Sequence, residues 1–261
     1  MIAIDLNDKV AIVTGAGKGM GRSIAITLAK AGASVMVSDI DLESAQKVSD
    51  EICSMGLSSK AIQTNVTSEK DAVALTNSTI QQFGSLDILV NNAGVSRAVP
   101  FVDINEQEWD RVFNVNVKGV YLCSRAAIPH LIKKNSGKIV NISSMVGKEA
   151  IPLFVHYSAS KFAVMGITQG LAKELAPYNI NVNAVCPGVV RTPLWDPLLN
   201  QLSEEKKISR EEAFEEFIEG IPLKRPQSPE DIAHTVAFLC SDLAKNMTGQ
   251  GVNVCGGMQL H

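Results

Sequence analysis

Apolar and polar residues follow two different periods along this chain of 261 residues. Short runs rich in valine and isoleucine predict seven strands, at 9–14, 34–39, 60–66, 86–94, 137–144, 180–188 and 249–257. Between them, apolar residues recur every three or four positions and predict helices at 20–31, 42–55, 68–83, 106–133, 157–177 and 229–240. Because strands that alternate with helices pack as a parallel sheet covered on both faces, we predict an α/β fold with a doubly wound parallel sheet of about seven strands.

One stretch departs from this alternation. Residues 194–224 follow a Pro-Gly pair and contain two charged amphipathic pieces. Such a long excursion from a compact fold is typical of a segment that covers a site, so we predict a lid at about 189–225. Elsewhere no repeat, low-complexity tract or Pro/Gly-rich linker divides the chain, and we expect residues 1–261 to form a single domain.

Composition narrows the classes of partner. The formal net charge is −3 and the 24 Lys and Arg residues are scattered, so we expect no surface for nucleic acid. The five cysteines are widely spaced without a Cys-x-x-Cys pair, and we expect buried thiols of a reducing compartment and no metal site. The first residues lack the pattern of a signal peptide, and no run approaches 18 uncharged apolar residues. We therefore expect a soluble, cytoplasmic protein that does not bind membranes.

The sequence TGAGKGMG, residues 14–21, lies between the first predicted strand and the first predicted helix. Glycines at 15, 19 and 21 permit a tight turn and a close approach of the backbone to a pyrophosphate, whose charge the helix N-terminus favours. A merely structural glycine turn is the alternative interpretation. The position directly after a strand favours a dinucleotide site.

Asp39 ends the second predicted strand, 18 residues after Gly21. A carboxylate there can accept hydrogen bonds from both ribose hydroxyls of an adenosine and repels a 2′-phosphate, which indicates NAD rather than NADP. Lys18 points the other way, because a cation in the glycine turn can meet a 2′-phosphate. We weigh Asp39 more heavily, since no basic residue follows it in DIDLE. The alternative role for Asp39 is a helix N-cap.

Tyr157 and Lys161 stand four residues apart in a predicted helix, so their side chains are neighbours on its surface. The Lys161 ammonium would then favour the phenolate form of Tyr157 and lower its pKa. The alternative is a pair of unrelated, solvated side chains. The pair by itself does not decide between the two interpretations.

Taken in order, the motifs of the chain resemble the classical short-chain dehydrogenase/reductase family over essentially its whole length. The matches are the glycine pattern at Gly15, Gly19 and Gly21, NNAG at 91–94, Asn116 in NVNVKG, Ser144 in NISS, Tyr157 with Lys161, and PGVVRT at 187–192. Met20 stands where the family usually has Ile. The resemblance implies a Rossmann fold that binds a nicotinamide cofactor.

The resemblance also implies the residues that contact the cofactor. They are Gly15, Lys18, Gly19, Met20, Gly21, Asp39, Ile40, Asn65, Val66, Asn92, Ala93, Gly94, Tyr157, Lys161, Pro187, Gly188, Val190 and Thr192. Asn65 departs from the family pattern, in which an Asp often meets the adenine amino group. Because an Asn carbonyl oxygen can still accept that hydrogen bond, we expect weaker discrimination for adenine rather than loss of the cofactor.

The same resemblance assigns catalytic roles to Asn116, Ser144, Tyr157 and Lys161. Transfer of a hydride to or from an alcohol carbon requires a group that moves the hydroxyl proton, and Tyr157 is the general acid/base. Lys161, together with the positive charge of oxidised nicotinamide, lowers the pKa of Tyr157, and Lys161 also hydrogen-bonds the nicotinamide ribose. Ser144 donates to the substrate oxygen, and Asn116 holds a water that leads to solvent. Taken singly, Ser144 could cap a turn and Asn116 could be an ordinary helix residue.

Two neighbours of these motifs have open roles. His156 precedes Tyr157, and we expect a wall of the substrate pocket or a surface position rather than a second base. An apolar cluster in the predicted lid, formed by Leu194, Trp195, Leu198 and Leu199, lies either in the core or over the substrate.

Together these features predict an NAD-dependent short-chain alcohol dehydrogenase or ketone reductase that acts on a small molecule. The lid and the C-terminal tail look most similar to polyol and vicinal-diol dehydrogenases of the family, so the first prediction for the substrate is a polyol or vicinal diol. A 3-oxoacyl-carrier-protein reductase and a hydroxysteroid dehydrogenase are the enzymatic alternatives, and a nicotinamide-sensing regulator is the non-enzymatic one. The resemblance implies a homotetramer packed through helices 106–133 and 157–177.

Overall fold

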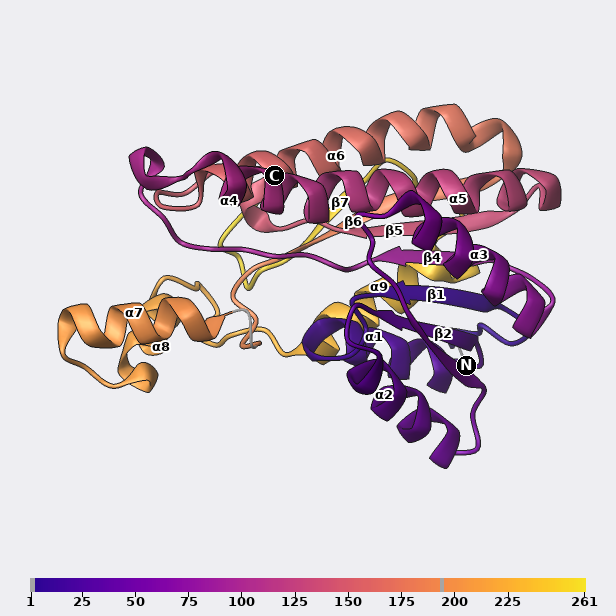
Figure 1. Ribbon diagram of the computed structural model, residues 1–261, viewed down its shortest axis with the longest axis horizontal. Helices are drawn as coiled ribbons and strands as arrows, with labels where there is room; N and C mark the ends of the chain where they lie inside the picture. The colour runs from indigo at the N-terminus through magenta and orange to yellow at the C-terminus, as the bar shows by residue number, and fades with distance from the viewer. Residues whose placement is uncertain (1–2, 193–194) are drawn as a thin grey trace.

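The computed structural model describes residues 3–192 and 195–261, and within them seven parallel strands form one sheet (Figure 1). The strands are β1 (Val10–Thr14), β2 (Ser34–Asp39), β3 (Ser59–Gln63), β4 (Ile88–Asn91), β5 (Gly137–Ile142), β6 (Ile180–Pro187) and β7 (Gly251–Val254). Their order across the sheet is β3-β2-β1-β4-β5-β6-β7. The predicted doubly wound parallel α/β fold is therefore confirmed.

The order of the strands reverses next to β1. The chain passes from β1 outward through β2 to β3, and then returns to place β4 on the other side of β1. At such a point the loops diverge and leave a crevice beyond the carboxyl ends of the strands. A ligand site is thus expected just beyond Thr14 and Asn91, the last residues of β1 and β4.

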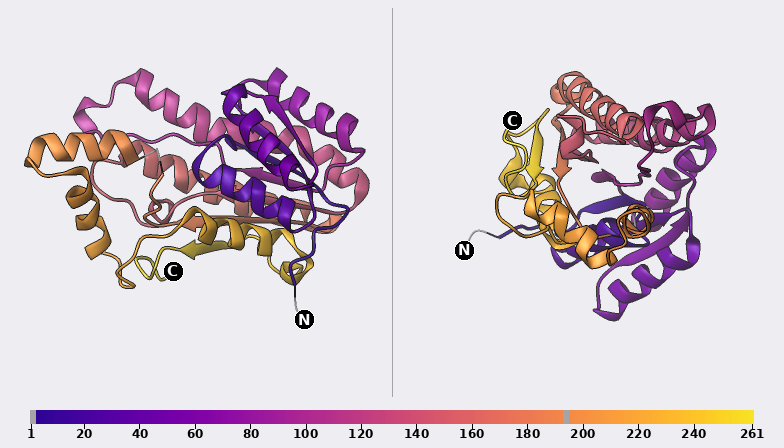
Figure 2. Two further views of the ribbon diagram at one scale, coloured as in Figure 1. Left: turned by 90° about the horizontal axis from the view of Figure 1, so that it is seen from below. Right: turned by 90° about the vertical axis from the view of Figure 1, so that its left-hand side faces the viewer.

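Alternate strand residues face two hydrophobic layers. In β1, Ala11 and Val13 join one core cluster and Ile12 joins the other, and all three are buried. The first layer packs against α1 (Gly19–Lys30), α2 (Leu42–Ser54) and α9 (Pro229–Cys240), and the second against α3 (Glu69–Phe83), α5 (Gly119–Lys134) and α6 (Val155–Leu175). Figures 1 and 2 show these two sets on opposite faces of the sheet. Because both faces are covered, the central strands are continuous apolar runs in the sequence.

The predicted helix 106–133 is interrupted. It begins as α4 (Glu106–Phe113), widens into a π-helical segment, η2 (Asn114–Lys118), and continues as α5. Such wide turns are rare in proteins, and where they occur they often lie at a functional site. Asn116 lies in the middle of η2.

Four predicted strands extend too far at their carboxyl ends. The predictions 60–66, 86–94, 137–144 and 249–257 run two or three residues beyond β3, β4, β5 and β7. These residues continue the strand-like pattern of the sequence, but their backbones leave the ladder at the edge where the crevice lies. The error therefore falls on residues that border the ligand site, such as Asn65, Gly94 and Ser144.

The predicted lid contains two helices, α7 (Asp196–Lys206) and α8 (Arg210–Glu219), which extend from one end of the molecule (Figures 1 and 2). Residues 193 and 194 of the lid lie outside the described part of the chain. The lid has a small core of its own, formed by Val189, Leu199, Ala213, Phe214 and Ile221. Its apolar residues are thus packed largely against one another rather than against the sheet.

The longest helix of the described residues, α6, has 21 residues and carries Lys161, Lys173 and Glu174. Among the described residues, no helix combines the length and the apolar composition that crossing a bilayer requires.

Candidate active site

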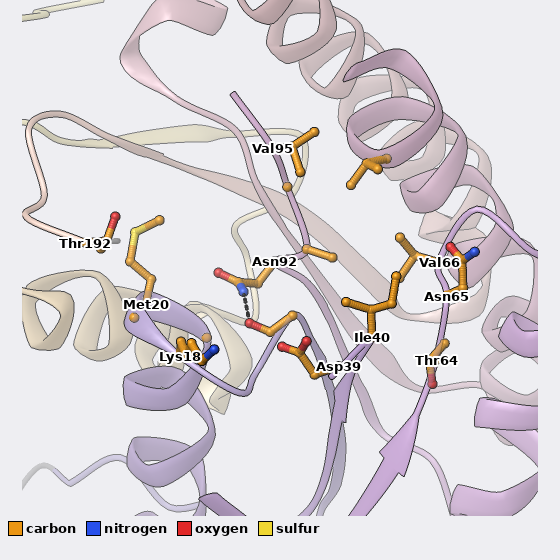
Figure 3. A pocket seen from close by; sticks show the side chains of 16 residues that line it. Lys18, Met20, Asp39, Ile40, Thr64, Asn65, Val66, Asn92, Val95 and Thr192 are labelled. Carbon is orange, nitrogen blue, oxygen red and sulfur yellow. Dashed lines mark hydrogen bonds between the residues drawn. The ribbon is translucent and has the colours of Figure 1, made fainter. Parts of the chain in front are cut away.

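A cavity of about 330 Å³ opens at the carboxyl ends of β1, β2 and β4, where the strand order reverses (Figure 3). We call it the cofactor-side cavity. Its walls contain many of the residues predicted to bind the cofactor: Gly15, Lys18, Gly19, Met20, Gly21, Asp39, Ile40, Asn65, Val66, Asn92, Ala93, Gly94 and Thr192. Thr64, Val95 and Val115 also line it and were not predicted. Their only signal in the sequence is that each lies next to a predicted residue.

Glycine backbones shape the cofactor-side cavity. Gly15 and Gly19 have φ angles of +62° and +54°, which residues with a Cβ adopt rarely. A Cβ on Gly21 would overlap the carbonyl oxygen of Gly15 and come within 2.5 Å of Asn92 Nδ2. Asn92 Nδ2 in turn donates to the carbonyl oxygens of Thr14 and Gly15, each at 2.9 Å. The turn is therefore closed too tightly for larger residues.

Helix α1 begins without a side-chain cap. By contrast, α2, α3 and α4 are capped by Asp41, Ser68 and Asn105. The N–H groups in the first turn of a helix have no acceptor within the helix, and here that turn borders the cofactor-side cavity. Its free donors and the positive end of the helix dipole fit a pyrophosphate. The residues of this structure thus fit a dinucleotide.

The Asp39 carboxylate is fixed at the edge of the same cavity. Its Oδ2 accepts from Gly17 N at 2.8 Å and its Oδ1 accepts from Asp41 N at 3.0 Å. The alternative prediction, that Asp39 caps the next helix, is wrong because Asp41 has that role and accepts from Ser44 N. Lys18 Nζ lies 3.5 Å from Asp41 Oδ2, so the cation of the glycine turn already faces a carboxylate.

Asn65 is held within its own loop. Its side-chain amide oxygen, Oδ1, accepts from the N–H of Thr67 at 3.0 Å and from the Thr67 hydroxyl at 2.8 Å. Both lone pairs of that oxygen are therefore used. The predicted hydrogen bond to the adenine amino group would require one of these two bonds to be replaced.

A second cavity, of about 240 Å³, adjoins the first through Met20 and Thr192, which line both. We call it the substrate-side cavity. Its walls are mostly apolar, and its polar side chains are Ser96, Arg97, Ser143, Ser144, Tyr157 and Thr192. Pro187, Gly188 and Val190 were predicted to contact the cofactor, and they line this cavity rather than the cofactor-side one. Pro187 ends β6, and Gly188 and Val190 follow directly after it, on the substrate side.

Ser144 and Tyr157 lie together in the wall of the substrate-side cavity. Burial raises the pKa of Tyr157 to about 12, and a hydrogen bond with Ser144 acts in the opposite direction. Ser144 Oγ also accepts from Val146 N at 3.3 Å, so it caps the short helix that follows β5 as well. The two hydroxyls can therefore both reach one substrate oxygen.

Lys161 is almost completely buried beside Tyr157. Its Nζ lies 5.6 Å from the centre of the Tyr157 ring and donates to the carbonyl oxygen of Ile142 at 2.8 Å. Burial lowers the pKa of Lys161 to about 8. The prediction that Lys161 and the charge of oxidised nicotinamide together lower the pKa of Tyr157 stays a prediction. Without the cofactor, desolvation of the hydroxyl is the larger effect and raises that pKa.

Asn116 joins three parts of the site. Its Oδ1 accepts from Val95 N at 2.8 Å, while its Nδ2 donates to Val95 O at 2.9 Å and to Ser160 Oγ at 3.0 Å. A Cβ on Gly94 would lie 3.4 Å from Asn116 Oδ1 and 3.5 Å from Lys161 Nζ, so these side chains converge behind the Gly94 backbone. Neither Asn116 nor Lys161 lines the two cavities. The water-holding role predicted for Asn116 stays a prediction, and the contacts show that it ties η2 to α6.

His156 does not lie where it was expected. The prediction of a pocket wall or surface position is wrong, since its side chain is fully buried and lines neither cavity. Helix α6 turns it toward α4, where His156 Nε2 lies 3.6 Å from Glu108 Oε1. Burial lowers the pKa of His156, and Glu108 acts against this. Its place behind α4 separates it from the reacting groups.

The lid supplies aromatic walls. The ring of Trp195 packs edge-on against Phe214 at 5.6 Å and against Phe217 at 4.9 Å between centroids. Trp195, Leu198 and Phe217 line the substrate-side cavity, whereas Leu199 is buried in the lid core. Further wall residues were not predicted: Arg97, Met145, Ile151, Phe154 and Met258. They lie far apart in the sequence and share no motif.

Comparison with known proteins agrees with this geometry. The sequence pattern of the family described as short chain dehydrogenase matches residues 9–203. The chain is 43% identical over 253 residues to the 3-oxoacyl-[acyl-carrier-protein] reductase FabG of Staphylococcus aureus (strain N315), covering 97% of this chain and 98% of that one. The FabG of Thermotoga maritima is 38% identical over 257 residues, covering 98% and 99%. A crystal structure described as a short-chain alcohol dehydrogenase from Sinorhizobium meliloti 1021 superposes with a TM-score of 0.89 at 35% identity, covering 98% of each chain.

Proposed function

This chain belongs to the short-chain dehydrogenase family and is a nicotinamide-dependent oxidoreductase; on that premise we propose that it reduces the ketone of 3-oxoacyl thioesters with NADH. The observation that carries the substrate class is the substrate-side cavity. Its few polar side chains leave an apolar wall from Val189, Val190, Trp195 and Phe217. Such a wall suits an acyl chain with one reacting carbonyl.

The first prediction for the substrate, a polyol or vicinal diol, fits this wall poorly. Each hydroxyl of a polyol that is buried without a hydrogen-bond partner costs about 1–3 kcal/mol. The relatives named 3-oxoacyl-[acyl-carrier-protein] reductase are 38–43% identical over nearly the whole chain. They support the alternative that the sequence left open, and we adopt it.

Asp39 carries the proposal for the cofactor. Two backbone N–H groups hold its carboxylate at the cavity edge, where a ribose with free 2′- and 3′-hydroxyls can donate to it. A 2′-phosphate would meet a negative charge at the same place. We therefore propose NADH rather than NADPH.

The chain's own residues then serve the proton half of the reaction. The nicotinamide supplies the hydride when bound. With a pKa raised to about 12, Tyr157 stays protonated at neutral pH and can donate its proton to the carbonyl oxygen. Ser144 donates a hydrogen bond to the same oxygen as negative charge develops there. Lys161 and Asn116 lie outside the cavity and stabilise this arrangement through their hydrogen bonds to Ile142 and Ser160. A nicotinamide-sensing regulator would have no use for these hydroxyls.

The test is a substrate panel followed by NADH absorbance. We expect 3-oxoacyl thioesters of N-acetylcysteamine to be reduced with a higher kcat/KM than the oxidation of sorbitol or butanediol reaches. A higher kcat/KM for a polyol would overturn the proposed substrate class. We also expect NADH to exceed NADPH by more than tenfold in kcat/KM, at least ~1.4 kcal/mol, and Asp39→Ala to narrow that gap. Equal turnover with NADPH would overturn the cofactor.

The predicted homotetramer remains a proposal. Tyr121 on α5 and Phe162 on α6 are 50% and 44% exposed. Large apolar side chains on the outer faces of these helices support packing against a second copy. A monomer in sedimentation at micromolar concentration would overturn it.

A further inference from the structure

Helix α6 carries two pairs of polar side chains in its first turns. Tyr157 and Lys161 form the pair that serves the proposed reaction. His156 and Ser160, each one residue earlier, form a second pair with the same spacing, and both are 0% exposed. We call them the anchoring pair. Because successive residues of a helix point in directions about 100° apart, the anchoring pair faces a different neighbour from the reacting pair.

The anchoring pair packs against the interrupted helix formed by α4 and η2. Ser160 Oγ accepts from Asn116 Nδ2 at 3.0 Å and donates to the carbonyl oxygen of Tyr157 at 2.6 Å. His156 Nε2 lies 3.6 Å from Oε1 of Glu108, which precedes Asn116 by about two helical turns. Two separate contacts therefore fix the direction of α6 relative to α4, and with it the backbone that carries the Tyr157 hydroxyl.

The imidazole of His156 is buried without a hydrogen bond of normal length. Within the part of the chain that the structure describes, neither of its ring nitrogens has a hydrogen-bond partner, and the contact with Glu108 is slightly longer than a hydrogen bond. A buried polar group without a partner is unfavourable, and a shift of roughly half an ångström would close this distance. His156 is thus placed to donate its Nε2–H to the Glu108 carboxylate.

Charge keeps both partners in the forms that this bond requires. Among the described residues, the charged groups that act on His156 are Glu108 and Arg111 of α4 and Arg97 of the loop after β4. Burial is the largest effect and lowers the pKa of His156, so the imidazole is mostly neutral at pH 7. Arg111 donates to both oxygens of Glu108 and lowers the pKa of that carboxyl, which is therefore ionised. A neutral donor meets a charged acceptor.

We propose that His156 is a positioning residue of the reaction: its neutral imidazole, hydrogen-bonded to Glu108, holds the first turn of α6 so that the Tyr157 hydroxyl points at the substrate oxygen. The proposal rests on the proposed role of Tyr157 as proton donor. Protonation of His156 disrupts the arrangement, because its second N–H has no acceptor among the residues described and the charge is shut off from water. Acid therefore loosens the contact between α6 and α4, and turnover falls.

The test is the pH dependence of kcat for reduction, with saturating NADH and whichever carbonyl compound of the substrate panel is reduced. We expect kcat of the parent protein to fall as the pH drops below 6.5, the ordinary pKa of histidine. Tyr157 and Lys161 have pKa values of about 12 and about 8, so neither changes its charge in that range. A fall of kcat there points to another group.

Three variants and a control assign this fall to His156. His156→Leu lacks the donor, and kcat should fall about tenfold while KM and NADH affinity stay within twofold, since misplacing a reacting group by about 1 Å can cost about 10²-fold in rate. His156→Gln supplies a neutral donor; it should recover most of that loss and show no fall in acid. Glu108→Gln removes the charge that favours the imidazolium, so the fall should move to lower pH. His234→Gln is the matched control, because His234 is exposed on α9 and its loss should leave the profile unchanged.

An acid fall that persists in His156→Gln, or an unchanged kcat in His156→Leu, would overturn the proposal. Equal losses of kcat and NADH affinity in His156→Leu would do the same, because they indicate a general loss of structure. The profiles of His156→Gln and Glu108→Gln decide the question even where His156→Leu does not fold.

Amide hydrogen exchange, measured without substrate, separates this failure from failure of the proposed function. Peptides that cover residues 155–161 should exchange at least fivefold faster in His156→Leu than in the parent protein, and His156→Gln should restore slow exchange. If no carbonyl compound is reduced but this difference is found, the proposed role of Tyr157 fails and the anchoring contact of His156 stands. Equal exchange in all three proteins would show that His156 does not hold the first turn of α6.

Discussion

Backbone atoms line much of the cofactor-side cavity, whereas side chains form the part of the substrate-side cavity that the lid contributes. Between β1 and β4, backbone atoms form much of the wall, at Gly15, Gly19 and Gly94. In the lid, side chains form the wall of the substrate-side cavity, and the largest are Trp195, directly before α7, and Phe217 of α8. The residues around the first region follow strands whose side chains belong to the main core, whereas the lid residues pack into a separate small core.

This difference explains what each region can recognise. A wall of N–H groups at a helix N-terminus binds a phosphate whatever else the molecule carries, so it suits a cofactor shared by a family. A wall of apolar side chains on a protruding helical pair can change residue by residue without disturbing the sheet. Substrate choice is therefore expected to reside in the lid, and catalysis where the two regions meet.

The largest expected effect is at that meeting point. Tyr157→Phe removes only the hydroxyl that carries the proton, so kcat should fall by roughly 10²- to 10⁴-fold. NADH affinity, measured by fluorescence titration, should stay within twofold because the cofactor-side cavity is untouched. Near-normal turnover, with a deuterium isotope effect showing that hydride transfer limits the rate in both proteins, would contradict this assignment.

A single added methyl group should disrupt the glycine turn of the cofactor-side cavity. Gly21→Ala places a Cβ against Gly15 O and Asn92 Nδ2, and we expect NADH affinity to fall at least 100-fold and the free energy of unfolding to fall by about 1–3 kcal/mol. Gly220→Ala is the control, since its added Cβ would meet only Phe217 O, at an ordinary contact distance of 3.5 Å, and NADH affinity should stay within twofold. Tight NADH binding by Gly21→Ala would show that the turn is not a rigid cradle.

Buried Lys161 should leave a signature in the pH dependence of stability. Its pKa is about 8 in the folded protein and near 10.5 when unfolded, so the unfolded state binds more protons between these values. Stability of the parent protein relative to Lys161→Met should therefore rise with pH from about 8 to 10.5, by roughly 3 kcal/mol. Urea unfolding at several pH values measures this difference. A constant difference across that window would show that Lys161 is not desolvated.

A substitution in the lid should weaken binding of the substrate and leave binding of the cofactor unchanged. Trp195→Ala removes a wall of the substrate-side cavity and contacts with Phe214 and Phe217, so KM for the acyl thioester should rise about tenfold. NADH affinity should stay within twofold. If cofactor affinity fell as much as substrate affinity, the two regions would not be independent.

The smallest effect concerns Lys18. Asp41→Asn keeps an N-cap for α2 but removes the charge that faces Lys18, and we expect kcat/KM with NADPH to rise about two- to fivefold. Glu43→Gln is the control, because it releases the neighbouring cation Lys47 instead. No change in Asp41→Asn would show that the ion pair does not restrain Lys18.

Much of the cofactor side could be predicted because its signals are local. Gly15, Gly21 and Asp39 lie at fixed distances from predicted strands, and the turn geometry requires glycine whatever surrounds it. His156 shows the opposite case. Its neighbour Tyr157 was placed correctly at the site, but only the packing of α6 against α4 decides that His156 points away from it.

The sequence by itself determined the alternation of strands and helices, the parallel α/β fold, the glycine turn and the Tyr157–Lys161 spacing, since each depends on residues close together in the chain. Tertiary structure alone decided where the strands end, that burial rather than Lys161 dominates the pKa of Tyr157 without the cofactor, and that His156 faces Glu108. Desolvation and cavity walls depend on which distant segments pack together. No local pattern encodes that packing, because side chains from β6, α7 and the loop after β4 meet only when the chain has folded.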